Sequence, residues 1–542
     1  MLHIRINLDQ TGGIHCEVYP IFNVKIPEVK IEYSSELLPG SCRRRVGWLM
    51  DTIATRLYNY EKKLMITLLH VLLFSSISMA QNRPNIVLIM ADDLGGRDLP
   101  VYGNLFNEAP NIDKLASQGI QFNNAYAAPV CSPTRASIQS GQYPARVGIF
   151  DFITGHWRPF EEVTVPVHDV QYLPENITTI GDAMQSAGYK TGYFGKWHLG
   201  NNAEHLPGAR GYDKAHMYAG GGFYSPAFKP EYKSTEKKRL SEALTDMGVD
   251  FIIENKEEPF FLFISHYDVH VQLDADRDII DKYLEKDAAP DYACNAVYAA
   301  MIEHVDRSVG TIMNTIEKMG LADNTLFIFF SDNGGVDNRF DNVPLLGGES
   351  KDVYPDGHPL RYIATTNAPL RAGKGTLYEG GVRVPLIVRW PGKVKPASSS
   401  DAIVSSVDFY PTFLELAGGK SPEDQVLDGF SMVPALTENM FDPEREVFNH
   451  YPVYHHEQPM SAVRKGDWKI VENLVSGEYD LYNLAYDINE MTDLKYSYPD
   501  KLEEMKTVLN KWQQETNAAM PVPNPEFDPD RRYEWGKHPD RR

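Results

Sequence analysis

The sequence predicts an α/β fold: a mostly parallel β-sheet flanked by helices, followed by a smaller C-terminal α+β region around an antiparallel sheet. Two apolar runs of strand length, Asn85–Ala91 and Thr325–Phe330, are continuous rather than alternating, as in strands that are buried on both faces. Two further apolar runs, Phe260–Ile264 and Pro385–Val388, lie between helical stretches such as Ala293–Met319. Such alternation of buried strands and helices is typical of a parallel sheet.

Length and composition indicate a globular protein with more than one folded region. The chain has 542 residues, of which 42% are hydrophobic and 23% charged, as in ordinary globular proteins. This length exceeds the size at which single cores stop growing, so one large domain and a smaller one are expected. The formal net charge of −21 disfavours nucleic acid and anionic membranes as partners, so an anionic substrate needs a local basic site.

The first 80 residues are expected to lie outside the mature chain. Residues 64–77 form an apolar run of signal-peptide length that follows two lysines and leads to a cleavage-like site near Ala80. A short buried helix is the alternative, since the run is too short to span a bilayer comfortably. Because a long segment precedes the run, the true start is expected at Met50 or Met65. We therefore predict a secreted or periplasmic protein without a stable membrane anchor.

Changes in sequence texture predict further boundaries. A main domain is expected over residues 81–445 and a C-terminal α+β subdomain over residues 446–520. Within the latter, short segments after Met460 resemble antiparallel strands and Lys501–Thr516 resembles a packing helix. The tail, residues 521–542, is rich in Pro, Asp and Arg and is predicted to be an extended surface wrap or disordered.

Polar side chains follow two of the predicted strands at the point where each ends. Asp92 and Asp93 come directly after the first apolar run, and Asp332 and Asn333 follow the second. Ligands of open α/β sheets bind outside the carboxyl ends of the strands, so these side chains are expected to meet. They offer only oxygen donors, which a hard cation such as calcium or magnesium prefers. For either pair alone, helix or loop capping is the alternative.

Cysteine usage directs attention to one residue. Four cysteines are too few and too scattered for a disulfide framework or a zinc cluster. Cys131, in APVCSPTRASIQSG, stands just before a helix start led by Pro133, so its thiol is predicted to lie at a helix N-terminus, where anionic chemistry is favoured. A packed thiol is the alternative. Cys294, within a predicted helix, is expected to be a buried free thiol.

Five sequence blocks carry a resemblance to a known family. The segment C-S-P-T-R, from Cys131 to Arg135, matches the C-x-P-x-R signature of the type I sulfatases, and NIVLIMADDLG, GYKTGYFGKWHLG, SDNGG and PLRAGKGTLYEGGVRVP resemble sulfatase blocks in the family's order. The chain is thus similar to formylglycine-dependent sulfatases of the arylsulfatase-like, bacterial secreted polysaccharide type, from about Arg83 to beyond Asp493. The resemblance implies an alkaline-phosphatase-like fold and a sulfuric ester hydrolase.

The resemblance also implies two additions to the chain. A separate formylglycine-generating enzyme would oxidise Cys131 to formylglycine, whose hydrated form attacks sulfur and later releases sulfate. One calcium ion would polarise a sulfate oxygen and help ionise the attacking hydroxyl. The metal ligands implied by the resemblance are Asp92, Asp93, Cys131, Asp332 and Asn333. The catalytic residues implied by it are Cys131, Arg135, Lys196, His198, His270 and Lys374.

Three of these residues are expected to contact formylglycine. Arg135 lies four positions after Cys131 and hence on the same helical face. Lys196 and His198 lie two apart after a predicted strand, so in extended chain both side chains face one side. The resemblance implies that His198 accepts the proton of formylglycine during elimination of sulfate.

The remaining two residues are expected to meet the substrate. The resemblance implies that His270 meets the sulfate and the leaving oxygen and that Lys374 binds the sulfate; either residue could protonate the leaving alcohol. His266 is expected to be a structural or supporting group. Because the mechanism uses His198 and His270 in different protonation states, activity is expected to depend on pH at roughly 6 to 7 before local shifts.

A sulfated carbohydrate from extracellular polysaccharide is the expected substrate. Export places the protein where such polymers occur, and no apolar stretch after residue 81 approaches spanning length. The segment Val336–Thr366 is long enough to form a wall of the site, so a closed pocket that accepts chain ends is expected. The candidate sugar contacts are Arg339, His358, Arg361 and His450, with Trp157 and Arg158 as further candidates. For each of them an ordinary loop side chain is the alternative, and His455 and His456 are interpreted as surface histidines because no spacing supports zinc.

Two other functions stay open at this point. A phosphatase or phosphodiesterase of the same superfamily would share the sheet and metal edge, but such proteins usually place Ser or Thr where this chain has Cys131. A sulfatase fold that binds sulfated glycans without turnover would result if Cys131 were not matured.

Overall fold

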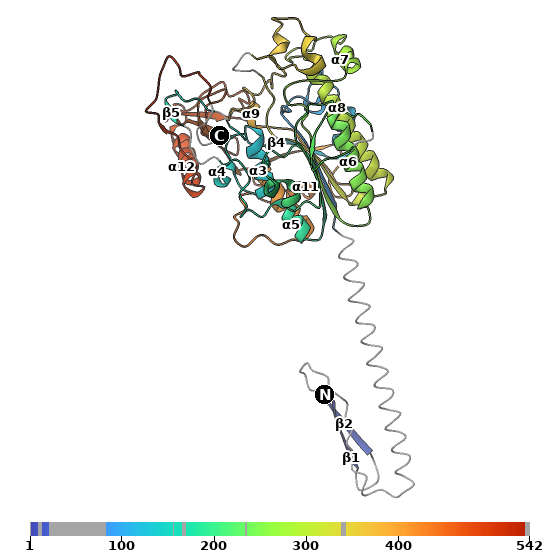
Figure 1. Cartoon of the computed structure of the whole chain (residues 1–542). Coiled ribbons are helices and arrows are strands. Elements are labelled where there is room, and N and C mark those ends of the chain that lie inside the picture. Colours follow the sequence, from blue (N-terminus) through green and yellow to red (C-terminus); the bar gives the residue numbers. More distant parts are fainter. Residues whose placement is uncertain are drawn as a thin grey trace. The chain divides into compact units, whose positions relative to one another are not determined.

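The computed structural model contains the α/β fold that the sequence predicts (Figure 1). It describes residues 83–155, 157–164, 170–233, 236–337 and 343–536, together with the backbone of residues 2–8 and 14–20. The chain divides into two units, Met1–Gln81 and Asn82–Arg542. In the first unit, strands β1 (Leu2–Leu8) and β2 (Ile14–Pro20) pair antiparallel. The apolar run at 64–77 and the cleavage site near Ala80 lie outside the described residues.

The second unit is built around a nine-stranded sheet with the order β12-β4-β11-β10-β3-β9-β6-β7-β8. Pairing is parallel from β10 through to β7 and between β12 and β4, whereas β11 and β8 run antiparallel to their neighbours. The strands are β3 (Asn85–Ala91), β4 (Ile120–Tyr126), β6 (Lys190–Gly195), β7 (Lys214–Tyr218), β8 (Phe228–Lys229), β9 (Phe260–Ser265), β10 (Thr325–Ser331), β11 (Leu386–Arg389) and β12 (Ser398–Ser405). All four apolar runs that were predicted as buried strands lie in this sheet.

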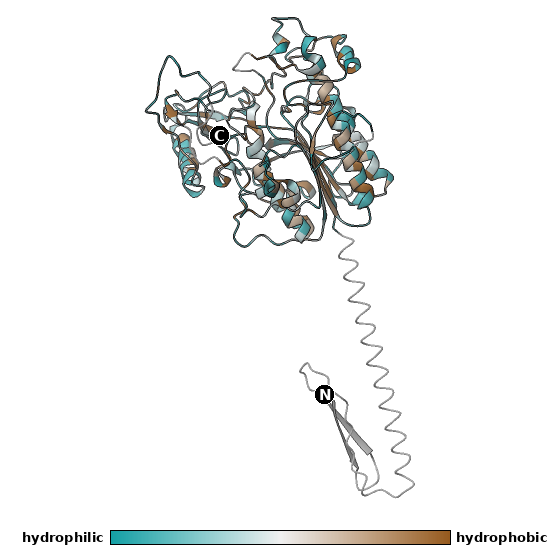
Figure 2. Ribbon diagram, viewed as in Figure 1, coloured by the Kyte–Doolittle hydropathy of each residue, from teal (hydrophilic) through white to brown (hydrophobic). Residues whose placement is uncertain are grey.

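Helices cover both faces of the sheet, and alternate residues of β3 pack against them. Val87 and Ile89 belong to one apolar core, while Ile86 and Leu88 belong to the core on the other face. The first core includes α2 (Pro110–Ser117), α6 (Leu240–Glu254), α7 (Arg277–Leu284) and α8 (Ala296–Lys318), and the second includes α3 (Cys131–Ser140), α5 (Ile180–Ser186), α10 (Phe409–Ala417) and α11 (Val433–Thr437). Full burial of each such side chain stabilises the fold by roughly 1.5–3 kcal/mol. Figure 2 shows the hydrophobic colour concentrated along the sheet.

A second, antiparallel sheet follows in the C-terminal region. It consists of β13 (Glu446–Tyr451), β14 (Met460–Lys465), β15 (Trp468–Asn473) and β16 (Tyr479–Asn483), which pair in sequence order. Helix α12 (Pro499–Glu515) packs on one face through Met505, Leu509 and Trp512. The other face packs against the main sheet region, where Tyr451 and Tyr126 belong to one shared core. Helix α4 (Pro144–Val147) and helix α9 (Glu379–Val382) lie in segments between the two regions.

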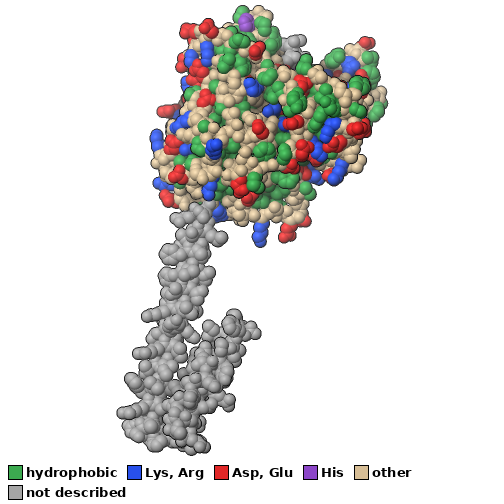
Figure 3. Space-filling model, turned by 180° about the vertical axis from the view of Figure 1, so that it is seen from behind, with side chains coloured by type: hydrophobic (Ala, Val, Ile, Leu, Met, Phe, Trp, Pro, Cys, Tyr) green, Lys and Arg blue, Asp and Glu red, His purple; other side chains and the backbone are tan. Residues whose placement is uncertain are grey.

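The C-terminal tail begins in extended conformation. Strand β17 (Val522–Pro523) pairs with β5 (Val163–Thr164), so this part of the tail lies against the protein as the predicted surface wrap does. Residues 537–542 lie outside the described part. On the face shown in Figure 3, acidic and basic side chains are interspersed with hydrophobic ones. Among the described residues, no helix combines the length and the apolarity that crossing a membrane requires.

The prediction for Cys294 is wrong in its local structure. Cys294 precedes α8 instead of lying within it, and its backbone has a φ of 55°. The side chain is half-buried, and its thiol donates to the carbonyl oxygen of Ala289 at 3.5 Å. The helix begins only after Asn295, whose side chain caps the amides of Val297 and Tyr298.

Candidate active site

The carboxyl ends of β3 and β10 bring two polar pairs together. These strands are parallel neighbours, with Ala91 opposite Ser331, so the residues that follow them leave the sheet at the same edge. The amide of Asp93 donates to Asp332 Oδ1 at 3.1 Å, and Asn333 Nδ2 donates to Asp93 Oδ1 at 2.8 Å. All four side chains from 92, 93, 332 and 333 are buried. The parallel pairing of β3 with β10 therefore brings these four side chains together.

Cys131 lies at the N-terminus of α3, as predicted, although the helix begins at Cys131 itself rather than at Pro133. The side chain is buried. Its sulfur, one carboxylate oxygen each of Asp92 and Asp93, and one ring nitrogen of His270 all lie within 4.8 Å of one another. Positive charge from the helix N-terminus favours an anion at this position. The thiol thus lies beside two carboxylates and a histidine at the sheet edge.

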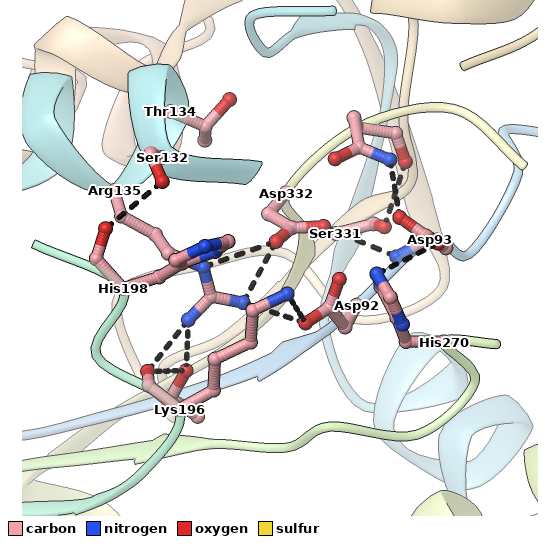
Figure 4. A network of polar contacts seen from close by, with 12 residues as sticks. Asp92, Asp93, Ser132, Thr134, Arg135, Lys196, His198, His270, Ser331 and Asp332 are labelled. Carbon is pink, nitrogen blue, oxygen red and sulfur yellow. Dashed lines mark hydrogen bonds and ion pairs between the residues drawn. The ribbon is translucent and has the colours of Figure 1, made fainter. Parts of the chain in front are cut away.

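Arg135 connects α3 to both strand ends (Figure 4). Its Nη2 donates to Asp332 Oδ2 at 2.7 Å and to Asp92 Oδ2 at 3.1 Å. Its Nη1 donates to the carbonyl oxygen of Lys196 at 2.7 Å and to Ser265 Oγ at 2.5 Å. Although burial lowers the pKa of Arg135, the two carboxylates outweigh this effect and raise it, so the guanidinium remains charged. Arg135 therefore fixes the carboxyl ends of four strands, β3, β10, β6 and β9, relative to the helix.

Two lysines reach the paired aspartates. Lys196 Nζ lies 2.5 Å from Asp92 Oδ2, and Lys374 Nζ lies 2.6 Å from Asp93 Oδ1. Burial by itself would lower the pKa of each lysine, but its aspartate partner raises it. Burial would likewise raise the pKa of Asp92 and of Asp93, but the neighbouring cations outweigh burial and lower both. The carboxylates are therefore ionised and the lysines protonated at neutral pH.

His198 has its own environment in the site. The prediction of an extended segment is wrong here, because His198 has a φ of 59° and its ring bonds through Nε2 to the carbonyl oxygen of Ile153. A carbonyl oxygen only accepts, so Nε2 carries the proton and Nδ1 carries the lone pair. Nδ1 is buried and has no hydrogen-bond partner. Burial and Lys196 lower the pKa of His198 to about 3, so the ring is neutral and the pH dependence predicted near 6 to 7 is not expected from it.

The two histidines after β9 face different surroundings. His270 Nε2 lies 3.7 Å from Asp93 Oδ2, and its Nδ1 lies 2.5 Å from the carbonyl oxygen of Val271, so Nδ1 carries a proton. His266 is fully buried, and its Nε2 lies 3.1 Å from Ser308 Oγ on α8. Burial lowers the pKa of His266 to about 3. The structure thus places His270 at the sheet edge and His266 in the core behind it.

The group at the strand ends fits a hard cation. Asp92 Oδ1 and Asn333 Oδ1 are buried oxygen atoms without a hydrogen-bond partner, which is costly unless something else binds them. Ionised carboxylates and an amide oxygen are donors of the type that calcium and magnesium prefer. Both oxygens of Asp332 already accept hydrogen bonds, Oδ2 from Arg135 and Oδ1 from the amide of Asp93, so its role as a metal ligand stays a prediction.

A cavity of about 470 Å³ opens beside these residues, within the usual range of small-molecule sites. Predicted catalytic residues that line it are Cys131, Lys196, His198, His270 and Lys374. Sequence reasoning missed other lining residues, among them Phe152, Trp197, Asn201, Tyr218, Tyr267, His455 and His456. The position of Trp197 between Lys196 and His198 was a local signal for this residue. No sequence signal linked His455 or His456 to the cavity, because they come from the loop after β13.

The predicted sugar contacts do not meet at this cavity. His358 stacks on Tyr354 with ring centroids 4.8 Å apart, and Arg361 pairs with Asp356 at 2.9 Å. Neither belongs to the described residues that line the cavity, and Arg339 lies outside the described residues.

The prediction for His450 also needs correction, because its side chain is buried in the C-terminal region. Its ring lies between Ser461 Oγ at 3.2 Å and the carbonyl oxygen of Ala519 at 2.9 Å. Burial lowers its pKa to about 4. Arg158, another candidate, pairs with Glu161 at 3.1 Å and donates to the carbonyl oxygen of His455.

Comparison with known proteins shows to which protein family the chain with this site belongs. A family profile described as Sulfatase matches residues 84–419, which include both strand ends, Cys131 and Lys374. The chain belongs to the sulfatase family. A second profile, described as N-sulphoglucosamine sulphohydrolase, C-terminal, matches residues 373–518. This sulfatase is therefore a sulfuric ester hydrolase, and its two sheets form the alkaline-phosphatase-like fold of the family.

Individual relatives cover most of the chain. A sulfatase of Formosa agariphila is 32% identical over 547 residues, covering 84% of this chain and 94% of that protein. The steryl-sulfatase of Rattus norvegicus is 30% identical and covers 68% of this chain and 73% of its own, and the N-acetylgalactosamine-6-sulfatase of Mus musculus is 29% identical and covers 72% of each. The crystal structure of Ps i-CgsB in complex with k-i-k-neocarrahexaose has a TM-score of 0.65 at 29% identity, covering 79% of this chain and 92% of that chain.

Proposed function

We propose that this sulfatase removes sulfate from sulfated carbohydrates and that residue 131 acts as its nucleophile after oxidation of Cys131 to formylglycine. The position of Cys131 carries the proposal. Its buried sulfur lies at a helix N-terminus and within 4.8 Å of ligand atoms of Asp92, Asp93 and His270. The C-S-P-T-R segment around it supports the modification.

The proposed reaction uses both hydroxyls of the hydrated aldehyde. One hydroxyl loses its proton and its oxygen attacks sulfur. The bond from sulfur to the alcohol oxygen breaks, and the alcohol leaves with a proton from the enzyme, which gives a sulfate ester on residue 131. The second hydroxyl then loses its proton, the C=O bond re-forms, and the C–O bond to sulfate breaks. Addition of water regenerates the hydrated aldehyde. Water never has to attack the stable sulfate ester.

His198 is the proposed acceptor of the proton in the second stage. Its ring is neutral at working pH, and the geometry at Ile153 leaves the lone pair on Nδ1. That atom is buried without a hydrogen-bond partner, so it is available to a hydroxyl of residue 131. Arg135 holds the strand ends that form this part of the site and contacts Asp92 and Asp332 directly.

Two residues are placed to protonate the leaving alcohol. Lys374 remains protonated beside Asp93, whereas His270 can donate from Nε2 only when its ring carries two protons. Both line the cavity. Loss of the general acid is expected to lower the rate most for esters with poor leaving groups, because these depend most on protonation.

We therefore predict that either His270→Ala or Lys374→Ala, but not both, lowers kcat/KM roughly 10²–10⁴-fold for galactose 6-sulfate and far less for 4-methylumbelliferyl sulfate. Steady-state sulfate release from the two esters measures this. If a substitution weakens only the binding of the sulfate group, kcat/KM should fall by the same factor for both esters. Equal losses on both esters in both variants would contradict any role of these residues in proton donation, and His358→Ala, which lies away from the cavity, is the control.

We propose that the cation held at this site is calcium. Asp92, Asp93 and Asn333 would hold it together with residue 131, and the orphaned oxygens of Asp92 and Asn333 support this. Asp332 would complete the set if its contacts with Arg135 and Asp93 rearrange. When bound, the ion polarises a sulfate oxygen and favours ionisation of the attacking hydroxyl.

A carbohydrate is the proposed substrate class. Tyr218, Tyr267 and Trp197 line the cavity and suit the apolar faces of sugar rings. Among the relatives, one acts on N-acetylgalactosamine 6-sulfate by its name and one solved structure holds a neocarrahexaose. A steroid sulfate is the second candidate, because apolar residues such as Met217 also line the cavity and steryl-sulfatase is a relative.

A panel of substrates tests this choice. Sulfate release is expected from sulfated mono- and oligosaccharides of carrageenan and glycosaminoglycan type, faster than from the intact polymers and faster than from estrone sulfate. The reason is the limited volume of the cavity, about 470 Å³, which we expect to accept a chain end more readily than a chain interior. Preference for the steroid would reject the carbohydrate class, and polymer rates equal to oligosaccharide rates would reject the chain-end pocket. A phosphate monoester in the same panel tests phosphatase activity.

We also propose that the protein is secreted or periplasmic and is matured by a formylglycine-generating enzyme. The apolar run at residues 64–77 supports export. Amino-terminal sequencing of exported protein is expected to give a start near residue 81. An intact residue 64–77 segment in the active protein would contradict this.

A further inference from the structure

The C-terminal sheet presents a row of three polar residues toward the main sheet. Arg464 on β14 lies opposite Lys469 on β15, and Lys469 lies opposite Tyr482 on β16. Residues that lie directly opposite each other in an antiparallel sheet project from the same face. Tyr482 belongs to the core shared with the main sheet, which identifies the face, and all three side chains are buried. Arg464 donates there through Nη1 to the hydroxyl of Tyr126 on β4.

The other two residues of the row contact the segment that carries Lys374. Lys469 Nζ lies 2.9 Å from Oε1 of Glu379, the first residue of α9. The hydroxyl of Tyr482 accepts from Arg371 Nη1 at 3.0 Å. Lys374 lies between these two contacts in the chain, after Arg371 and before Glu379. The C-terminal sheet therefore binds the chain on both sides of the lysine that reaches the active site.

The segment between the two contacts is a closed loop, called here the lysine loop (residues 371–380). At its base, the amide of Gly380 donates to the carbonyl oxygen of Arg371 at 2.8 Å. Within it, the amide of Lys374 donates at 3.1 Å to the carbonyl oxygen of Gly335, which follows the polar pair at the end of β10. The C-terminal sheet thus holds the base of the loop, and the loop meets the end of β10 at Lys374.

Lys469 is shared by two buried carboxyl groups at the base of the loop. Its Nζ also lies 2.8 Å from Oε1 of Glu490, and Glu490 Oε2 accepts from the amide of Glu379 at 2.7 Å. Burial would raise the pKa of Glu379, but the neighbouring cations, Lys469 foremost, outweigh burial and lower it. Buried ion pairs contribute little net stability, because desolvation offsets most of the attraction, whereas breaking one is costly. The contacts of Lys469 therefore favour one placement of the loop base over others.

We propose that Lys469 and Tyr482 are positioning residues for Lys374: by holding the base of the lysine loop, they set where its ammonium group meets the sulfate ester. This inference rests on the proposed role of Lys374 at the sulfate. Neither Lys469 nor Tyr482 belongs to the described residues that line the cavity, so both act through Lys374 rather than on the substrate. A shift of a catalytic group by about 1 Å can lower a rate roughly 10²-fold, so a small displacement of the loop is measurable.

A double-mutant cycle separates positioning from a general structural role. Lys469→Met is introduced into the parent and into Lys374→Ala, and kcat/KM is measured with whichever of galactose 6-sulfate and 4-methylumbelliferyl sulfate loses more in Lys374→Ala. In the parent we expect a loss of roughly 10–10²-fold. In Lys374→Ala the same substitution should lower kcat/KM by less than about 2-fold, because the group that it displaces is already absent. Lys469→Arg should retain most of the activity, since it keeps the positive charge beside Glu379.

The matched control is Lys465→Met on the same sheet. Lys465 pairs with Glu504 on α12 at 3.6 Å instead of with the lysine loop, so its replacement should leave kcat/KM unchanged in both backgrounds. Tyr482→Phe serves as the test if Lys469→Met does not fold. It removes only the hydroxyl that Arg371 binds, and it should show the same dependence on the background with a smaller loss.

The outcomes distinguish this inference from the proposed role of Lys374. Equal losses from Lys469→Met in the parent and in Lys374→Ala would show a purely structural role and would overturn the positioning alone. Unchanged turnover in both Lys469→Met and Tyr482→Phe would overturn it as well. Unchanged kcat/KM of Lys374→Ala on both esters would reject the role of Lys374 at the sulfate, and this inference with it.

Discussion

Replacement of Cys131 by alanine is expected to abolish sulfate release, by roughly 10⁴-fold or more, as loss of a covalent nucleophile does in other enzymes. Alanine cannot be oxidised to an aldehyde, so no hydrated form exists to attack sulfur. Lys374, the residue proposed to bind sulfate, would remain beside Asp93 but would have no nucleophile as its partner in the covalent step. Mass spectrometry of the peptide that contains residue 131 is expected to find an aldehyde in place of the thiol in active parent protein.

The matched control is Cys294→Ala. Both cysteines are free, but Cys294 lies before α8, where its sulfur contacts Ala289 rather than the catalytic group. Its replacement is expected to leave turnover unchanged. Thermal unfolding of Cys131→Ala should resemble that of the parent, since the substitution removes one small buried atom. Active protein that retained an unmodified Cys131 would falsify the formylglycine mechanism and would favour a binding or side activity of the unmatured fold.

The sequence was sufficient to predict the arrangement at the strand ends. Continuous apolar runs identified β3 and β10 as strands that are buried on both faces. Such a run can be recognised in the local sequence without knowledge of distant contacts. Once both strands are parallel neighbours, the pairs that follow Ala91 and Ser331 must leave the sheet together. Arg135 could be placed near Cys131 because helical spacing alone fixes that relation.

The wall of the cavity could not be predicted in this way. His450 was chosen from its local surroundings, but strand β13 alternates: Val447 and Tyr451 face the core shared with the main sheet, whereas Phe448 faces α12 and His450 contacts Trp512 there. A local sequence does not say which of the two faces meets the catalytic region. That choice depends on the packing of the C-terminal sheet against residues more than 250 positions away, such as Tyr126.

His198 shows a second limit, which concerns backbone conformation. A segment after a strand was taken to continue in extended form, but a positive φ at His198 turns the ring toward Ile153. The sequence G-K-W-H-L-G carries no residue that requires this conformation at the histidine. The buried environment that lowers the pKa of His198 to about 3 follows from this turn and from Lys196, so the pH dependence could not be predicted either.

The second large effect concerns the cation. Removal of calcium by a chelator is expected to suppress sulfate release almost completely, and added calcium should restore it. Calcium should also stabilise the folded protein, because it binds the native arrangement of Asp92, Asp93 and Asn333 and relieves repulsion between the ionised carboxylates. At a calcium concentration 100 times the Kd, this linkage amounts to about 2.7 kcal/mol, which thermal unfolding in the absence of substrate can measure.

Asp92→Asn is expected to remove both effects of calcium, on activity and on unfolding. The substitution keeps the size of the side chain but removes the charge that binds the ion and pairs with Lys196. Asp113→Asn, on α2 and away from the catalytic group, removes one carboxylate of the same kind and should leave the calcium-dependent shift unchanged. Restoration of activity by zinc but not by calcium would reject the hard-cation site. A calcium-dependent shift that persists in Asp92→Asn would place the ion elsewhere, because Asp92 Oδ1 is one of two oxygens at these strand ends, with Asn333 Oδ1, that are buried without a hydrogen-bond partner.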